Sequence, residues 1–332
     1  MTDRLVVIGG DAAGMSAASQ ARRRRGPDDL EILAFERGPH TSYSACGIPY
    51  LVGGVVTDPD RLVARWPQQF RDRFGIDVRT RHEVIGIDLG GRHVVVHDLE
   101  AGSEFREPFD QLVVATGARP IRPRLEGSDA AGIHSVQTLS DGVAITEDIR
   151  DRSPRRAVVV GAGYIGLEMA EAFARLGLET TLVELDEQPM RTLDPDMGAL
   201  VAHAIRAVGV TLLTGQAVSA FETSGGRVTG VIAGGRTIPA DIVALGLGSR
   251  PDVSLAADAG IDVGTSGGIV TDIRMRTSSE GVWAAGDCVE VFHRVSRRPA
   301  AIALGTHANK QGRVAGINIG GGYATFPGVV GT

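Results

Sequence analysis

The feature that most constrains the fold is a strand, glycine turn and helix pattern that occurs twice. The first copy, RLVVIGGDAAGMSAASQARRR, runs from Arg4 to Arg24 and is followed by LEILAFE, which ends at Glu36. The second copy, RAVVVGAGYIGLEMAEAFARLG, runs from Arg156 to Gly177 and is followed by LETTLVE, which ends at Glu184. An apolar strand that turns on glycines into a helix is the pattern of a dinucleotide-binding unit. Its repetition predicts two such units in one chain.

Each copy also closes in the same way, with an apolar strand that runs into a similar turn. These strands read LVVATGARP over 112–120 and IVALGLGSRP over 242–251. We therefore predict an α/β fold with two Rossmann-like domains, the second inserted into the first. The first domain is expected to be discontinuous, over 1–118 and 250–322, and the second to span 119–249.

The glycine spacing is complete in the second copy and altered in the first. Gly161, Gly163 and Gly166 fit the G-x-G-x-x-G fingerprint, whereas Asp11 stands where the first copy would have its middle glycine. In this fingerprint, the pyrophosphate of the cofactor sits at the positive end of the helix, and an acidic residue after the next strand receives the ribose hydroxyls. Glu36 and Glu184 are predicted to be these acidic residues.

Composition narrows the possible partners and compartment. The chain has 332 residues, 43% of them hydrophobic, and a net charge of −6, which argues against binding to nucleic acid. It has no apolar run of the roughly 18 residues that a membrane-spanning helix needs, and MTDR leads directly into a short strand rather than a secretory signal. Two cysteines far apart in sequence do not form a disulfide framework, so we expect a cytoplasmic protein. No metal site is predicted.

Taken in order, Gly9 to Gly14, Glu36, ATGARP, GAGYIGLE, Glu184 and AAGDC resemble the FAD-dependent pyridine nucleotide-disulfide oxidoreductases. The resemblance covers nearly the whole chain and implies FAD in the first domain and NADH or NADPH in the second. It also implies that the helix opened by HANKQGRVAG points its N-terminus at the flavin. The positions that it assigns to cofactor binding are Gly9, Asp11, Ala12, Gly14, Glu36, Arg37, Ala115, Thr116, Gly117, Gly161, Gly163, Ile165, Gly166, Glu184, Gly248, Gly286, Asp287 and Ala303.

The stretch TSYSACGIPYL, over 41–51, contains the candidate redox residue, Cys46. The paired cysteine of many family members is missing, so a lone sulfur would cycle through a sulfenic acid, a persulfide or a mixed disulfide with a small thiol. A helix that begins near Pro49 would help to stabilise its thiolate. Ser42 and Ser44 are candidate hydrogen-bond donors to the sulfur or to its partner.

The pattern SxxxCGxPY resembles that of the coenzyme A-disulfide reductases, which work with one cysteine, although Ala45 stands where these proteins often have asparagine. By the same resemblance, Tyr164 and Glu168 flank the nicotinamide side of the flavin. Gln20 and Arg23, three positions apart on one helix, are candidate partners for the phosphates of coenzyme A. Glu184 favours NADH over NADPH, although Arg191 is close to it in sequence.

Two other functions remain open from the sequence. The single-cysteine architecture also resembles NADH oxidases and NADH peroxidases, but these have a histidine at the position of Ala12; His40, His82 and His307 are possible substitutes. A flavoprotein that passes electrons to a protein partner would not need Cys46. The resemblance also implies a C-terminal dimerisation domain that would begin at 323–332, and a homodimer for the full-length protein.

Overall fold

The computed structural model describes residues 2–331 and divides into two compact units. Unit 1 comprises Met1–Tyr43, Val63–Arg119 and Arg250–Thr332, and unit 2 comprises Ser44–Leu62 and Pro120–Ser249. The chain passes between the units through two short strands that pair with each other, β8 (Ala118–Pro120) and β17 (Ser249–Pro251). Most of unit 2 is thus inserted into unit 1, which confirms the predicted α/β fold with two dinucleotide-binding domains.

Unit 1 is built on a parallel sheet with the strand order β19-β7-β1-β2-β3. Its central strand β1 is buried on both faces, which is why its sequence is a continuous apolar run instead of an alternating one. The strands of this sheet are β1 (Asp3–Ile8), β2 (Leu30–Glu36), β3 (Ile76–Thr80), β7 (Gln111–Val114) and β19 (Val282–Ala284). The remaining elements are the antiparallel sheet β4 (His82–Asp88), β5 (His93–Asp98) and β6 (Ser103–Pro108), the short strands β18 (Ile269–Val270), β20 (Val289–His293) and β21 (Arg298–Ala300), and the helices α1 (Ala12–Arg22), α3 (Pro67–Phe74), α7 (Ser254–Asp258) and α8 (Gly305–Ile319).

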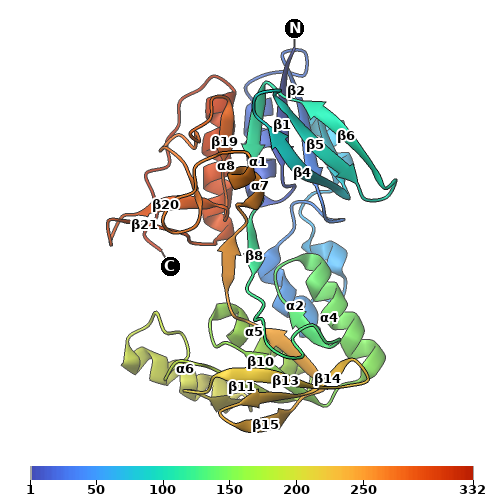
Figure 1. Cartoon of the computed structure of the whole chain (residues 1–332), viewed down its shortest axis with the longest axis vertical. Helices are drawn as coiled ribbons and strands as arrows, with labels where there is room; N and C mark the ends of the chain where they lie inside the picture. Colours follow the sequence, from blue (N-terminus) through green and yellow to red (C-terminus); the bar gives the residue numbers. More distant parts are fainter. Residues whose placement is uncertain (1, 332) are drawn as a thin grey trace. The chain divides into compact units, whose positions relative to one another are not determined.

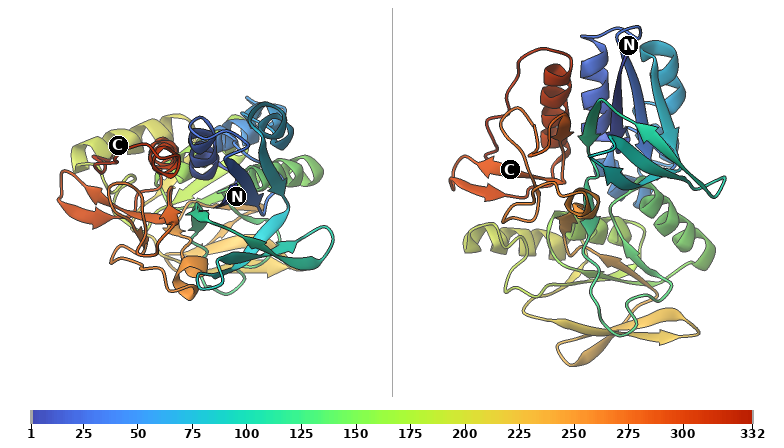
Figure 2. Two further views of the ribbon diagram at one scale, coloured as in Figure 1. Left: turned by 90° about the horizontal axis from the view of Figure 1, so that it is seen from above. Right: turned by 45° about the horizontal axis from the view of Figure 1, so that its top comes forward.

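Helices α1 and α8 come from opposite ends of the sequence and pack side by side, as Figure 1 shows and the left view of Figure 2 shows nearly end-on. Their contact is very close at two glycines of α8. A Cβ atom at Gly312 would lie 2.1 Å from the carbonyl oxygen of Ala13, and one at Gly316 would lie 2.2 Å from that of Ala17. Only glycine on α8 and small residues on α1 permit this approach, which fixes the start of α8 beside the first glycine loop.

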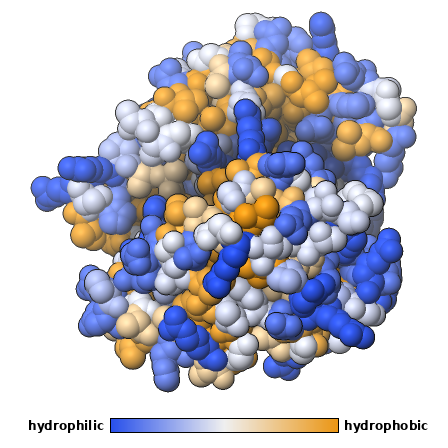
Figure 3. All heavy atoms as spheres, turned by 60° about the horizontal axis from the view of Figure 1, so that its bottom comes forward, coloured by the Kyte–Doolittle hydropathy of each residue, from blue (hydrophilic) through white to orange (hydrophobic). Residues whose placement is uncertain are grey.

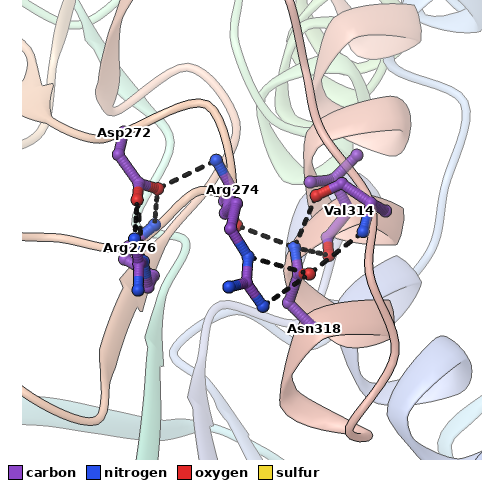
Figure 4. A network of polar contacts seen from close by, with 6 residues as sticks. Asp272, Arg274, Arg276, Val314 and Asn318 are labelled. Carbon is purple, nitrogen blue, oxygen red and sulfur yellow. Dashed lines mark hydrogen bonds and ion pairs between the residues drawn. The ribbon is translucent and has the colours of Figure 1, made fainter.

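Asn318, near the end of α8, links the chain beyond this helix to the rest of unit 1 (Figure 4). Its Nδ2 donates to the carbonyl oxygens of Val314, Arg274 and Ala324, at 3.0, 3.1 and 2.8 Å. Its Oδ1 accepts from the Arg274 guanidinium and from the backbone amide of Ala324. Asn318 is buried, and these bonds use both its donor and its acceptor atoms, as a buried amide requires.

Unit 2 has its own parallel sheet, with the strand order β12-β11-β10-β16-β9. Its strands are β9 (Ile133–Ser135), β10 (Arg156–Val160), β11 (Glu179–Val183), β12 (Thr211–Leu213) and β16 (Ile242–Leu245). An antiparallel sheet of β13 (Val218–Ser224), β14 (Arg227–Ala233) and β15 (Arg236–Pro239) packs on it through a separate apolar cluster. The helices are α2 (Ile48–Val52), α4 (Leu139–Arg152), α5 (Tyr164–Arg175) and α6 (Pro195–Ala207), with the 3₁₀ turns η1 (Ala45–Gly47) and η2 (Pro59–Leu62).

The segment Ser44–Leu62 groups with unit 2, whereas the sequence-based boundary places it with the rest of 1–118. Its apolar face explains this grouping, because Ile48 and Val52 are buried in one cluster with Ile145 of α4 and Met169 of α5. Burial of this kind stabilises by roughly 1.5–3 kcal/mol for each large aliphatic side chain. The Cys46 segment is therefore covalently continuous with unit 1 but packed as part of unit 2.

The described surface mixes hydrophilic and hydrophobic side chains, as the face drawn in Figure 3 shows. Among the helices within residues 2–331, none has the length and apolar character needed to cross a membrane. In the same residues, no group of three or more His, Cys, Asp or Glu side chains is arranged to hold a metal ion.

Candidate cofactor and substrate site

The first glycine loop joins β1 to α1 at the carboxyl end of the unit 1 sheet. Gly9 has a positive φ of +106°, and a Cβ atom at Gly14 would lie 1.9 Å from the carbonyl oxygen of Gly9. The Glu36 carboxylate at the end of β2 accepts the backbone amides of Gly10, at 2.8 Å, and Gly38, at 2.7 Å. The loop is thus held by backbone geometry on one side and by a carboxylate on the other.

The second glycine loop repeats this arrangement in unit 2, between β10 and α5. Gly161 has φ +97°, and a Cβ atom at Gly166 would lie 1.8 Å from the carbonyl oxygen of Gly161. The Glu184 carboxylate accepts the amides of Ala162, at 2.5 Å, and Asp186, at 2.9 Å. The two acidic residues that the sequence pairs therefore make equivalent hydrogen bonds.

Asp11 is the clear difference between the loops. It is the residue just before α1, and its Oδ1 accepts the backbone amide of Tyr43 at 3.2 Å, which attaches the loop to the chain that leads toward Cys46. Burial raises the pKa of Asp11 to about 7, and the charges of Glu36 and Asp287 add to the shift. This carboxyl group therefore carries a proton for part of the time near neutral pH.

The ATGARP turn after β7 completes the same edge of unit 1. A Cβ atom at Gly9 would lie 2.2 Å from the carbonyl oxygen of Ala115, so Ala115 contacts the glycine loop directly. Thr116 donates its hydroxyl to the carbonyl oxygen of Asp252 at 2.6 Å, and the amide of Asp252 donates to Gly117 at 2.9 Å.

Asp252 is a residue of this edge that the sequence analysis did not single out. It is buried, and its carboxylate lies 2.7 Å from Arg119 and 4.0 Å from Arg37. Arg37, predicted to bind cofactor, is thus oriented by a buried acid. This acid immediately follows Pro251, the last residue of β17, and its role becomes visible only when the two ends of unit 1 are brought together.

The Gly286-Asp287 turn after β19 lies against small residues. Gly286 donates its amide to Oε1 of Gln311 at 2.7 Å, and Ala13, Ala285 and Ala308 form a small buried cluster beside it. Burial raises the pKa of Asp287, which Leu304 partly offsets through a backbone hydrogen bond. Ala303 precedes Leu304, the residue just before α8.

In unit 2, the predicted residues occupy the first two turns of α5 and the turn after β16. Tyr164 is the first residue of α5 and is 60% exposed, and Ile165 next to it is half-buried. Glu168 lies one turn further on, and burial together with the charge of Glu171 raises its pKa. Gly248 has φ +82° in the turn that leads into β17.

Cys46 lies in η1, with its side chain exposed, two residues before α2 begins at Ile48. Pro49 is in the first turn of that helix, as the sequence indicates, but α2 has only five residues, so it contributes little to the stabilisation of a thiolate. Cys288 contrasts with it. Cys288 is fully buried, its sulfur donates to the carbonyl oxygens of Ala285 and Val114, and burial raises its pKa to about 11.

A cavity of about 430 Å³ opens in unit 1 along α1. We call it the α1 cavity; it is lined by Asp11, Ala12, Met15, Ser16, Ser19, Gln20, Arg23, Ser42, Tyr43, Ala64, Arg65, Phe70, Asn309 and Arg313. It brings together Ser42, Gln20 and Arg23, which were predicted separately. Arg65 and Arg313 were not predicted from the sequence, although Arg313 follows Asn309 by four positions and so shares its face of α8.

The α1 cavity is positively charged. Three arginines line it against a single carboxylate, Asp11. Within residues 2–331, Arg23 and Arg313 make no ion pair, so their charges are available to a ligand. The guanidinium of Arg65 lies over the rings of Phe70 and Phe74, which fixes its place on the wall.

The three histidines named as possible substitutes at Ala12 are in different environments. His82 donates from Nδ1 to the carbonyl oxygen of Thr80, at 2.8 Å, and pairs with Asp98. His40 lies 6.5 Å, centroid to centroid, from the ring of Trp66. His307 is in the first turn of α8, where its Nδ1 is buried without a hydrogen-bond partner and burial lowers its pKa. None of the three lines the α1 cavity.

The two glycine loops fit dinucleotides on structural grounds. A Cβ atom at Gly163 would meet no atom within 4 Å, which leaves the space above the second loop open for close approach of a diphosphate. The first loop is bordered by the small side chains of Ala13, Ala285 and Ala308, and the protonatable Asp11 limits repulsion of a diphosphate there. The residues present are therefore compatible with FAD in unit 1 and NAD(P)H in unit 2.

Comparison with known proteins gives the class. The pyridine nucleotide-disulphide oxidoreductase family model matches residues 3–312. The chain is 36% identical over 334 residues to the NAD(P)H coenzyme A polysulfide/persulfide reductase of Pyrococcus horikoshii, which covers 100% of this chain and 73% of that protein. It is 35% identical over 324 residues to an NADH oxidase of Methanocaldococcus jannaschii, over 97% of this chain and 71% of that protein.

A solved structure, that of an NAD-dependent persulfide reductase from A. fulgidus, superposes with a TM-score of 0.94 at 40% identity, over 98% of this chain and 60% of that one. The chain thus spans about 60% of the length of that relative. It belongs to the pyridine nucleotide-disulphide oxidoreductase family, an assignment that its two glycine loops support independently. Membership implies FAD and NAD(P)H as cofactors and makes the chain a flavin-dependent oxidoreductase.

Proposed function

We propose that this chain is the catalytic part of a reductase that uses NAD(P)H to cleave a sulfur–sulfur bond in a small disulfide, persulfide or polysulfide. Coenzyme A is the favoured thiol. The observation that carries the proposal is the α1 cavity, where arginines without ion-pair partners lie beside Ser42 and Tyr43, immediately before the Cys46 segment. Guanidinium groups grip phosphates with two parallel N–H donors, which suits the several phosphates of coenzyme A.

The reaction requires a sulfur nucleophile, and we assign this role to Cys46. Its thiolate attacks one sulfur of the substrate, forms a mixed disulfide and releases the other half as a thiolate. Bound FAD supplies the two-electron carrier between NAD(P)H and the cysteine. Two electrons then cleave the mixed disulfide, the Cys46 thiolate is regenerated, and the second thiol leaves with a proton. Cys288 does not take part, because its thiol is buried and its pKa is raised.

The residues of unit 2 are proposed to bind and admit the reductant. The Glu184 carboxylate would accept the ribose hydroxyls and repel a 2′-phosphate, which favours NADH over NADPH. Arg191 is exposed and close in sequence, so it is the residue that would weaken this preference. Tyr164, 60% exposed at the start of α5, is proposed to cover the nicotinamide side of the flavin, with Glu168 one turn away.

The runner-up is an NADH oxidase or peroxidase. The related M. jannaschii protein, which is an NADH oxidase, favours it, and a lone cysteine serves that chemistry through a sulfenic acid. Ala12 argues against it, because an alanine cannot transfer a proton to a peroxide oxygen, and general acid help of this kind is worth roughly 10²- to 10⁴-fold. Electron transfer to a protein partner is the third possibility, and Cys46 would be dispensable for it.

The test compares substrates and variants in one assay. NADH and NADPH consumption is measured with coenzyme A disulfide, coenzyme A persulfide, polysulfide, hydrogen peroxide and oxygen. We expect sulfur substrates to be reduced fastest and Cys46→Ser to lose at least about 10³-fold of that rate, as loss of a nucleophile does. Cys288→Ser, the matched control, should keep it. Arg23→Ala with Arg313→Ala should raise KM for the coenzyme A substrates, whereas the exposed Arg73→Ala should not.

Three results would contradict the proposal. Faster turnover with peroxide or oxygen than with every sulfur substrate would favour the oxidase. Full activity in Cys46→Ser would favour electron transfer to a partner. The third result comes from mass spectrometry of protein purified without reductant. A thiol adduct found only on Cys288 would reverse the assignment of the two cysteines.

A further inference from the structure

Unit 2 contains a second large cavity, which the proposed function does not use. Its volume is about 660 Å³, within the range of small-molecule sites. We call it the arginine cavity; it is lined by Arg152, Ser153, Pro154, Arg155, Arg156, Glu179, Arg227, Val228 and Asp241. Four of these nine residues are arginines, and none is aromatic.

The arginine cavity lies at the edge of the unit 2 sheet opposite to the glycine loop. Arg156 and Glu179 are the first residues of the paired strands β10 and β11, and Asp241 immediately precedes β16. The glycine loop follows the last residue of β10. A strand of five residues is roughly 16 Å long, so one ligand cannot occupy both ends. A molecule in the arginine cavity would therefore be bound independently of the nicotinamide cofactor.

Two of the four arginines are held in place by carboxylates. Arg156 pairs with Asp241 at 2.6 Å, and Arg227 pairs with Asp148 of α4 at 2.6 Å. Asp241 also accepts the backbone amides of Arg155 and Arg156, at 3.0 and 2.9 Å, and the hydrogen bond from Arg156 lowers its pKa to about 2. These acids thus orient two guanidinium groups, each of which keeps N–H donors for a further acceptor.

The other two arginines have no counterion. Arg152 and Arg155 are exposed, and across residues 2–331 neither makes an ion pair. Arg152 and Arg155 line the same side of the cavity because the chain turns sharply between them. Helix α4 ends at Arg152, Ser153 has a left-handed conformation with φ 49°, and Pro154 leads into β10. The lining carries four positive and two negative side chains, so the cavity has a net positive charge, and a bound anion would reduce the repulsion among its guanidinium groups.

We propose that the arginine cavity binds a small molecule through a phosphate or diphosphate group. Paired and unpaired guanidinium groups together provide the fork-shaped donors that phosphate oxygens accept. The lining is polar apart from Pro154 and Val228. Because no aromatic side chain lines the cavity, it offers no ring on which a base could stack, and recognition is directed to the phosphate rather than to a base.

The experiment uses the FAD-loaded chain with saturating NAD⁺ and measures binding of inorganic pyrophosphate and of inorganic phosphate by calorimetry at low ionic strength. All proteins carry Arg23→Ala and Arg313→Ala, which remove the free arginines of the α1 cavity as a competing anion site. The test variant adds Arg152→Ala and Arg155→Ala. The matched control adds Arg206→Ala and Arg236→Ala, two exposed arginines of unit 2 outside both cavities.

We expect one saturable pyrophosphate site that weakens at least tenfold in the test variant, stays unchanged in the control and weakens with added salt. Phosphate should bind at the same site with lower affinity. Thermal unfolding checks that both variants are folded, and Arg152→Gln with Arg155→Gln replaces the alanine pair if that variant is not. The proposal fails if pyrophosphate does not saturate, if test and control variants lose affinity equally, or if NAD⁺ abolishes binding, because the anion would then occupy the glycine loop.

Discussion

The two glycine loops share their backbone features but differ at the middle position of the glycine fingerprint. Both have a glycine with positive φ after the strand, both have a later glycine pressed against its carbonyl oxygen, and both are held by a glutamate from the next strand. At the middle position, unit 2 has Gly163 and unit 1 has Asp11. A Cβ atom at Gly163 would touch nothing, and Asp11 carries one without disturbing the loop.

The glycines of the fingerprint are therefore required for two different reasons, one in the protein backbone and one in the ligand. The outer glycines serve the chain itself, because any side chain there would overlap backbone atoms. We propose that the middle glycine, Gly163, serves the ligand, because a Cβ atom there would meet no protein atom within 4 Å. The fingerprint is therefore part folding signal and part binding signal, and the two parts can be tested apart.

The largest expected effect comes from the outer glycines. Gly14→Ala and Gly166→Ala each place a Cβ atom within 2 Å of a carbonyl oxygen, at 1.9 and 1.8 Å, so the loop must shift. We expect each to lower the free energy of unfolding by about 3 kcal/mol or more, the upper end for overpacking. Chemical denaturation measures this loss of stability. Gly163→Ala is the control, because Gly163 does not have a positive φ, whereas Gly177 does. A loss below about 1 kcal/mol in both loops would show that the backbone can relax.

The next effect concerns Asp11 and depends on pH. Its pKa is raised from 3.8 to about 7, so the folded state holds the proton more tightly than the unfolded chain. Stability contributed by the protonated form is therefore present below pH 4 and is lost as the pH rises toward 7. Asp11→Asn keeps an acceptor for the Tyr43 amide but cannot ionise.

We expect Asp11→Asn to gain stability over the wild type with rising pH, by up to about 4 kcal/mol between pH 4 and pH 8. Thermal or denaturant unfolding of the FAD-loaded proteins across that range measures the difference. Glu187→Gln, which removes an exposed carboxylate in unit 2, should show no such trend. If the stability difference between Asp11→Asn and the wild type is constant with pH, then Asp11 is ionised throughout.

The smallest expected effect on stability is that of Gly163→Ala. Its backbone, with φ −78° and ψ −171°, is accessible to alanine, and the new Cβ atom meets nothing within 4 Å. We expect the free energy of unfolding to change by less than about 0.5 kcal/mol. NADH binding, measured by fluorescence titration, should nevertheless weaken at least tenfold while FAD content stays constant. Unchanged NADH affinity would mean that the middle glycine is not needed for cofactor approach.

Much of this organisation could be predicted from the sequence, because the fingerprint is local. Gly161, Gly166 and Glu184 lie within one strand-turn-helix-strand stretch, so their spacing fixes their relative positions. The grouping of Cys46 with unit 2 could not be predicted in this way, since it depends on the packing of Ile48 and Val52 against helices about 100 residues away.

The same limit explains the residues that were missed. Arg313 comes together with Arg23 only because α8 packs on α1, and Arg65 reaches the same cavity from the loop before α3. Asp252 contacts Thr116 and Arg119 of the ATGARP turn only because the segment that begins at Arg250 folds back onto unit 1. A sequence shows which side chains share a helix face or a strand end, whereas a site made by distant segments requires the tertiary structure.

The close contact of α1 with α8 has a consequence for how the chain folds. Gly312 and Gly316 each make α8 less stable as an isolated helix, by roughly 1 kcal/mol relative to alanine. The helix recovers this only when α1 is already present to contact it. We therefore expect α8 to form on α1, so that unit 1 is completed only after residues 305–319 have been synthesised. Folding of unit 1 is thus cooperative between its two ends, with the whole of the inserted unit made in the interval.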